Sequence, residues 1–72
     1  MQLGKYRHYK GHEYEVLGLA HDSETLDEVV VYRALYNSPE FGDQALWARK
    51  KADFEAFVEF EGCEIPRFTY IQ

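Results

Sequence analysis

Two histidines, His8 and His12, lie four residues apart, a spacing that on a helix would direct both imidazole rings at one metal ion. The surrounding stretch YRHYKGHEYEVLG has a two-residue period instead, and Gly11 predicts a tight turn between the histidines. Side chains on either side of such a turn need not converge, and a closed zinc site needs four ligands. We therefore expect His8 in a strand, His12 in the turn, and neither a metal ion nor another cofactor.

A second group with chemical potential is the run His21-Asp22-Ser23-Glu24, which contains an imidazole, a hydroxyl and two carboxylates. These groups can perform acid–base catalysis, and a small hydrolase-like enzyme would use His8, His21 and Glu24. The same residue types also form ordinary polar turns, because their side chains hydrogen-bond the turn backbone. Small open barrels seldom enclose a water-excluding cavity, so we keep an enzyme as the alternative to a binding module.

The only cysteine, Cys63, lies between Glu61 and Glu64, whose negative charges disfavour a reactive thiolate. One cysteine cannot form a disulfide within its chain, and this suits a reducing cytosol. The N-terminal residues lack a signal-peptide pattern, and the longest apolar run, residues 29–32, is too short to span a bilayer. The sequence therefore predicts a cytoplasmic protein with no membrane partner.

Arg33 is a charged residue within an otherwise apolar predicted strand, where it must be exposed, paired or bound to a ligand. The simpler interpretation is an ion pair with a glutamate on a neighbouring strand, such as Glu15. The alternative is a groove in which aromatic rings hold a ligand and a guanidinium fixes an anion. Alternation places Arg33 and Tyr32 on opposite faces, so this groove would combine Arg33 with Tyr9 and Trp47.

The 72 residues predict one small domain, residues 1–72, whose core depends on large rings because so short a chain buries little surface. Aromatic residues make up 17% of the sequence, so they need no functional explanation as a group. The net charge of -5 disfavours nucleic-acid binding, which depends on neutralising phosphates with Lys and Arg. Local basic clusters nevertheless occur at Lys5, Arg7 and Lys10 and at residues 49–51.

The periodicity predicts four strands, over residues 5–10, 14–20, 29–36 and 46–49. Gly18 predicts a bend or bulge in the second strand, and residues 22–28 and 37–44 predict loops. Apolar residues at positions 54, 57 and 58 predict a short helix over 53–58, followed by a terminal hairpin over 58–61 and 64–70. We therefore expect a mainly β fold, either a small strongly bent sheet or an SH3-like β-barrel with one short helix.

Six separated motifs resemble, in order, the bacterial domain-of-unknown-function family 1653: YRHYKG at 6–11, YEVLG at 14–18, HDSET at 21–25, VVYRALY at 30–36, LWAR at 46–49 and PRF at 66–68. The resemblance implies a compact, mostly β domain that usually stands alone, with no established activity. One departure is Lys50, where the family pattern implies a proline, so the start of the short helix is expected to be looser here.

The favoured function is a binding or interaction module that presents an aromatic and basic patch to a peptide, a protein or an anionic small molecule. The predicted ligand-binding residues are Arg7, Tyr9, Arg33, Trp47 and Arg49. Besides the enzyme, we keep a structural protein that self-associates as a homo-oligomer, because a half-covered sheet has unpaired edges.

Overall fold

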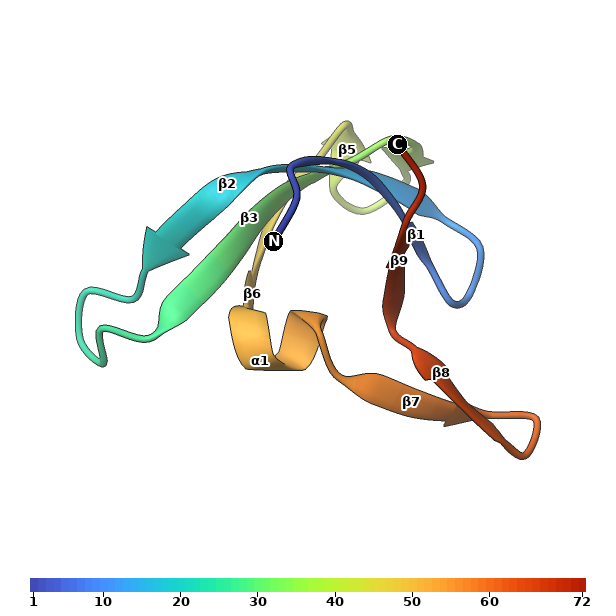
Figure 1. Ribbon diagram of the computed structural model, residues 1–72. Helices are drawn as coiled ribbons and strands as arrows, with labels where there is room; N and C mark the ends of the chain where they lie inside the picture. The colour runs from blue at the N-terminus through green and yellow to red at the C-terminus, as the bar shows by residue number, and fades with distance from the viewer.

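The computed structural model describes all 72 residues and shows a mainly β protein with one short helix (Figure 1). The strands and the helix, in chain order, are β1 (Gly4–His8), β2 (Glu13–His21), β3 (Glu28–Ala34), β4 (Asn37–Ser38), β5 (Gly42–Asp43), β6 (Leu46–Lys50), α1 (Lys51–Phe54), β7 (Phe57–Phe60), β8 (Cys63–Pro66) and β9 (Phe68–Tyr70).

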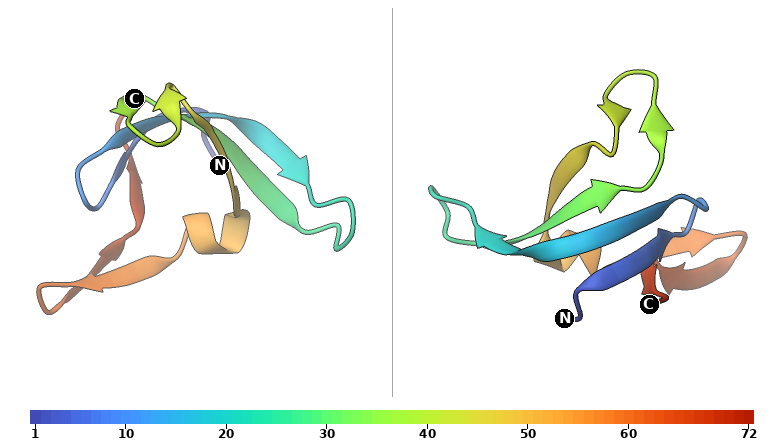
Figure 2. Two further views of the ribbon diagram at one scale, coloured as in Figure 1. Left: turned by 180° about the vertical axis from the view of Figure 1, so that it is seen from behind. Right: turned by 90° about the horizontal axis from the view of Figure 1, so that it is seen from above.

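Five strands form one antiparallel sheet in the order β6-β3-β2-β1-β9. The last strand returns to pair with the first, yet the edge strands β6 and β9 do not pair with each other, so the sheet stays open and does not close into a barrel. The sheet is strongly bent, and α1 lies beneath its concave side (Figures 1 and 2). The β2–β3 register shifts between Val16 and Gly18, which confirms the predicted irregularity at the glycine.

The alternating burial of side chains along β3 shows which face of the sheet carries the core. Val30, Tyr32 and Ala34 are buried on the concave face, whereas the residues between them lie on the convex face and are partly exposed. Phe54, the last residue of α1, is 1% exposed and stacks flat on Phe68 of β9, with ring centroids 4.0 Å apart. The helix thus contributes one ring that joins the middle of the sheet to its last strand.

Four sequence predictions about the elements were wrong in detail. The helix spans Lys51–Phe54 and not 53–58, because residues 57 and 58 pair with β8 and extended pairing overrides the short helical stripe. The third strand ends at Ala34, and the predicted loop 37–44 contains the two-residue strands β4 and β5. The terminal hairpin is interrupted at Arg67, after which β9 leaves β8 and joins β1.

The hairpin β7–β8 forms a separate two-stranded sheet that projects from the body (Figures 1 and 2). No helix of the structure is long or apolar enough to cross a membrane.

Candidate ligand-binding pocket

The structure does not bring the five predicted binding residues together. Arg33 lies on the convex face, where its guanidinium is 3.6 Å from a carboxylate oxygen of Glu15, its direct cross-strand partner. The ion pair expected between these two residues is therefore present. Trp47 is the cross-strand partner of Tyr32 and shares its concave face, so the predicted groove of Arg33, Tyr9 and Trp47 was wrong.

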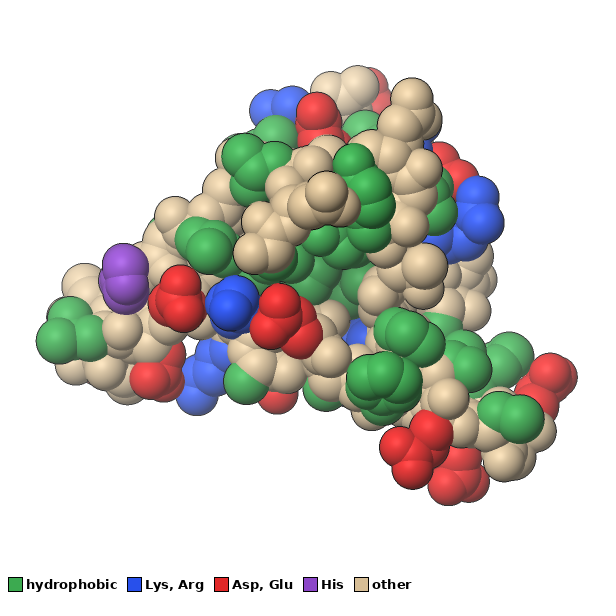
Figure 3. Space-filling view, in the orientation of Figure 1, with side chains coloured by type: hydrophobic (Ala, Val, Ile, Leu, Met, Phe, Trp, Pro, Cys, Tyr) green, Lys and Arg blue, Asp and Glu red, His purple; other side chains and the backbone are tan.

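Trp47 and Arg49 instead line a hollow of about 290 Å³ on the concave face, which we call the aromatic pocket. The register between β3 and β6 places Trp47 and Arg49 on this face, because they lie opposite Tyr32 and Val30 of β3. Hydrophobic side chains gather beneath the arch of the sheet (Figure 3). The residues that line the aromatic pocket are His8, Tyr14, Tyr32, Tyr36, Ser38, Phe41, Trp47, Arg49 and Phe68.

Two side chains on β6 carry hydrogen-bond donors at this pocket. The indole N–H of Trp47 is the one buried side-chain polar group in the chain without a hydrogen-bond partner, and leaving such a donor unsatisfied costs about 1–3 kcal/mol. Arg49 forms no ion pair, and its Nε reaches only the Tyr32 hydroxyl, at 3.5 Å. Arg49 can therefore donate to a ligand that brings acceptors, whereas the Trp47 N–H is buried beneath the surface of the pocket.

Four further lining residues provide three more protons to donate. His8 accepts the backbone N–H of Lys10 at Nδ1, so the proton of its neutral ring is on Nε2. The Ser38 hydroxyl oxygen accepts two backbone N–H groups, which leaves its O–H free. The hydroxyls of Tyr14 and Tyr36 are 3.0 Å apart, and one donates to the other, so the O–H of the accepting hydroxyl is free.

No carboxylate lines the aromatic pocket. A cage of rings without a carboxylate can attract a cation through its π faces, but the unpaired guanidinium of Arg49 opposes a second positive charge. An anion is favoured by both the charge and the surplus of donors. Tyr14, Ser38, Phe41 and Phe68 were absent from the sequence-based site, and knowledge of which strands pair would have been needed to find them.

His8 makes the stability of the folded protein depend on pH. Burial, and next the cationic Arg49, lower the pKa of the His8 imidazole below its usual 6.5. The neutral ring is therefore favoured in the folded state, while the unfolded chain takes up a proton near pH 6.5. Stability is unaffected above this pH and falls as the pH drops through 6.5 towards the folded-state pKa.

We expect the urea midpoint to decrease between pH 7.5 and pH 5, and His8→Asn to reduce that decrease. The matched control is His21→Asn, at the far end of β2. Urea denaturation followed by tryptophan fluorescence at both pH values measures the effect. An unchanged pH dependence in His8→Asn would contradict the assignment.

Arg7 and Tyr9 line a different hollow, of about 380 Å³, together with residues of β8 and β9. Arg7 already forms an ion pair with Glu13 at 3.0 Å, so its charge is compensated within the chain. His8 lines both hollows. The predicted residues thus divide among two hollows and the convex face.

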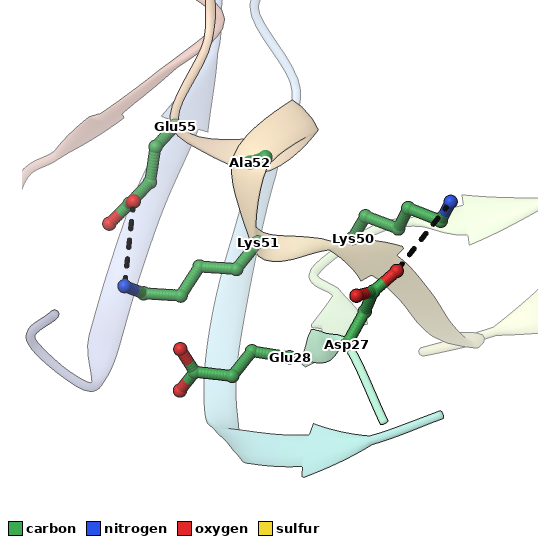
Figure 4. A pocket seen from close by; sticks show the side chains of 6 residues that line it. All are labelled: Asp27, Glu28, Lys50, Lys51, Ala52 and Glu55. Atoms are coloured by element: carbon green, nitrogen blue, oxygen red, sulfur yellow. Dashed lines mark ion pairs between the residues drawn. The ribbon is translucent and has the colours of Figure 1, made fainter. Parts of the chain in front are cut away.

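The basic run at residues 49–51 is also divided. Arg49 faces the aromatic pocket, whereas Lys50 pairs with Asp27 at 4.0 Å and Lys51 pairs with Glu55 at 3.7 Å. Figure 4 shows these two ion pairs on either side of a hollow of about 400 Å³. Three carboxylates and two ammonium groups line this hollow, so it has no surplus of positive charge for a phosphate backbone.

The structure does not bring together the three residues of the enzyme alternative. His8 ends β1 near the start of β2, whereas His21 ends β2 and Glu24 lies in the following loop, so the nine-residue length of β2 separates them. No group of three or more His, Cys, Asp or Glu side chains is placed to hold a metal ion. Cys63 is free and exposed at the start of β8. His12 lies in the turn after β1 and stacks on Tyr36, with ring centroids 4.1 Å apart.

Comparison with known proteins identifies a family and a similar solved structure. The sequence model of a family described as "Protein of unknown function (DUF1653)" matches residues 4–70. A crystal structure of a protein of that family from Bordetella bronchiseptica is 37% identical in sequence, with a TM-score of 0.88 over 99% of this chain and 87% of that chain. No curated protein matches the chain.

Proposed function

Because the chain belongs to the DUF1653 family, whose description assigns no activity, we propose a function from the aromatic pocket: the protein is a binding module for an anionic group carried on an apolar or aromatic body. The anionic group belongs to a peptide, a protein or a small molecule. Ring faces hold the apolar body, while Arg49 donates to the anion.

The observation that supports this proposal best is the surplus of donors. Arg49 has no carboxylate partner, and the Ser38 hydroxyl and one hydroxyl of the Tyr14–Tyr36 pair carry protons without an acceptor. A ligand with acceptor oxygens would pair with Arg49 and with these hydroxyls, which is the usual arrangement of a few placed polar groups in a mostly apolar pocket. The volume of about 290 Å³ lies near the lower end of ligand pockets, so one ring with one acidic group is a fitting size.

Benzoate and benzyltrimethylammonium provide matched probes, with one ring each and opposite charges. We expect benzoate to shift the indole N–H signal of Trp47 in ¹H–¹⁵N spectra, and the ammonium to leave it unchanged. Arg49→Gln should weaken benzoate binding about tenfold or more, because a hydrogen bond to a charged group contributes about 1.5–3 kcal/mol.

Arg33→Gln is the control variant, since Arg33 lies on the convex face beside Glu15. It should bind benzoate as the unmodified protein does. The proposal fails if benzoate shifts no residue of the aromatic pocket, or if the ammonium binds there and benzoate does not.

A further inference from the structure

The hairpin β7–β8, which we call the hairpin arm (residues 57–66), has little support from the rest of the protein. Its strands pair only with each other, and six of their eight residues are exposed. At its base Arg67 donates its backbone N–H to Ala56, and one ring contact joins Phe60 to Tyr9, with centroids 5.7 Å apart. An isolated two-stranded hairpin is at best marginally stable in water, so a partner that covers the arm would stabilise it.

The two faces of the hairpin arm differ. Phe60 lies on the face that contacts Tyr9 of the body. The register places Phe57, Glu59, Glu64 and Pro66 together on the other face, which we call the outer arm face. Phe57 there is 61% exposed, a large value for a phenylalanine. Figure 3 shows hydrophobic and acidic side chains together on this part of the molecule.

The negative charges of the outer arm face are not compensated by any cation. Glu59 and Glu64 are direct cross-strand partners, and like charges in this position repel. Glu61 in the turn adds a third carboxylate, and residues 57–66 contain no Lys, Arg or His. None of the four ion pairs in the chain involves these glutamates. The arm therefore presents an aromatic ring beside carboxylates, and a partner with donors would relieve their repulsion.

These features match the requirements of the aromatic pocket, which offers ring faces and unpaired donors without a carboxylate. We propose that the outer arm face docks into the aromatic pocket of a second copy of this chain, an inference that rests on the proposed binding of an anionic group. Phe57 lies among the rings, and Glu59 and Glu64 accept from Arg49. Reciprocal docking makes two identical contacts around a two-fold axis.

A second copy is favoured over an unrelated partner because both complementary surfaces are present on one chain. The arm carries three carboxylates and no cation, and the pocket carries an unpaired guanidinium and no carboxylate. The arm also projects away from the body, so it is free to reach a neighbouring molecule (Figure 2).

A charge exchange tests this docking by sedimentation equilibrium over a concentration series. The unmodified protein should form dimers. The pocket variant Arg49→Glu and the arm variant with Glu59→Arg and Glu64→Arg should each weaken dimerisation about tenfold or more, as expected for a central contact. An equal mixture of the two variants should dimerise again, because each pocket then faces an arm of opposite charge. Arg33→Glu, on the convex face, is the control and should dimerise normally.

A monomeric unmodified protein, or dimers that persist in both charge variants, would overturn the docking. Spectra of each variant alone confirm that it is folded, so loss of dimers is not loss of structure. The benzoate titration is repeated on the arm variant, whose pocket is unmodified and free. If the unmodified protein is monomeric while the arm variant binds benzoate, the docking is overturned and the proposed function stands, whereas a monomeric unmodified protein together with an arm variant that does not bind benzoate overturns both.

Discussion

Phe54→Ala is expected to leave most of the chain unfolded at 37 °C. Phe54 is 1% exposed and contacts three strands of the sheet, because its ring stacks on Phe68 and packs edge-on against Tyr6 and Tyr32. Truncating a buried phenylalanine costs about 3–5 kcal/mol. A single core in a domain of this size supplies about the same free energy of unfolding. Thermal unfolding followed by near-ultraviolet circular dichroism measures the loss.

Leu46→Ala is the control for this substitution. Leu46 is 62% exposed on the edge strand β6, and its truncation should change the free energy of unfolding by less than about 0.5 kcal/mol. A cooperative transition in Phe54→Ala close to that of the unmodified protein would show that α1 does not hold the sheet together.

The strands were predictable because β-branched and aromatic residues alternate with polar ones over lengths that a sheet uses. Val30, Tyr32 and Ala34 form one face in the sequence and one buried face in the structure. The helix was harder, because Phe54 and Phe57 share a helical spacing although only the first is helical. Pairing of Phe57 with Pro66 is a non-local contact that a local period does not contain.

The site was only partly predictable for the same reason. Alternation correctly separates Arg33 from Tyr32, yet it does not tell which of the two shares a face with Trp47. That depends on the register between β3 and β6, which Ala34 and Ala45 help to fix through a backbone hydrogen bond at the end of the pairing. A shift by one residue would place Trp47 on the convex face. The ion pair of Arg33 with Glu15 was accessible from the sequence, since it follows from neighbouring strands alone.

Gly4→Ala is expected to have the second largest effect. Gly4 has a φ of +125°, which favours glycine, and an added Cβ would overlap the backbone carbonyl of Gln72. That carbonyl accepts the backbone N–H of Lys5 at 2.6 Å, and Ile71 donates its backbone N–H to Lys5 at 2.9 Å. The substitution therefore strains the backbone, at a cost of about 1–3 kcal/mol. It also pushes the start of β1 away from the segment that follows β9.

Substitutions at two other glycines distinguish the backbone strain from the overlap with Gln72. At Gly18 an added Cβ would have no heavy atom within 4 Å and φ is not positive, so Gly18→Ala should be close to neutral. Gly11 has a φ of +110° with open space around it, so Gly11→Ala should show the backbone strain without the steric overlap. Urea denaturation should therefore rank the losses as Gly4→Ala, Gly11→Ala and Gly18→Ala, and faster hydrogen exchange of the Lys5 amide should appear in Gly4→Ala alone. Equal losses in Gly4→Ala and Gly11→Ala would mean that the contact with Gln72 does not hold β1 and the C-terminal segment together.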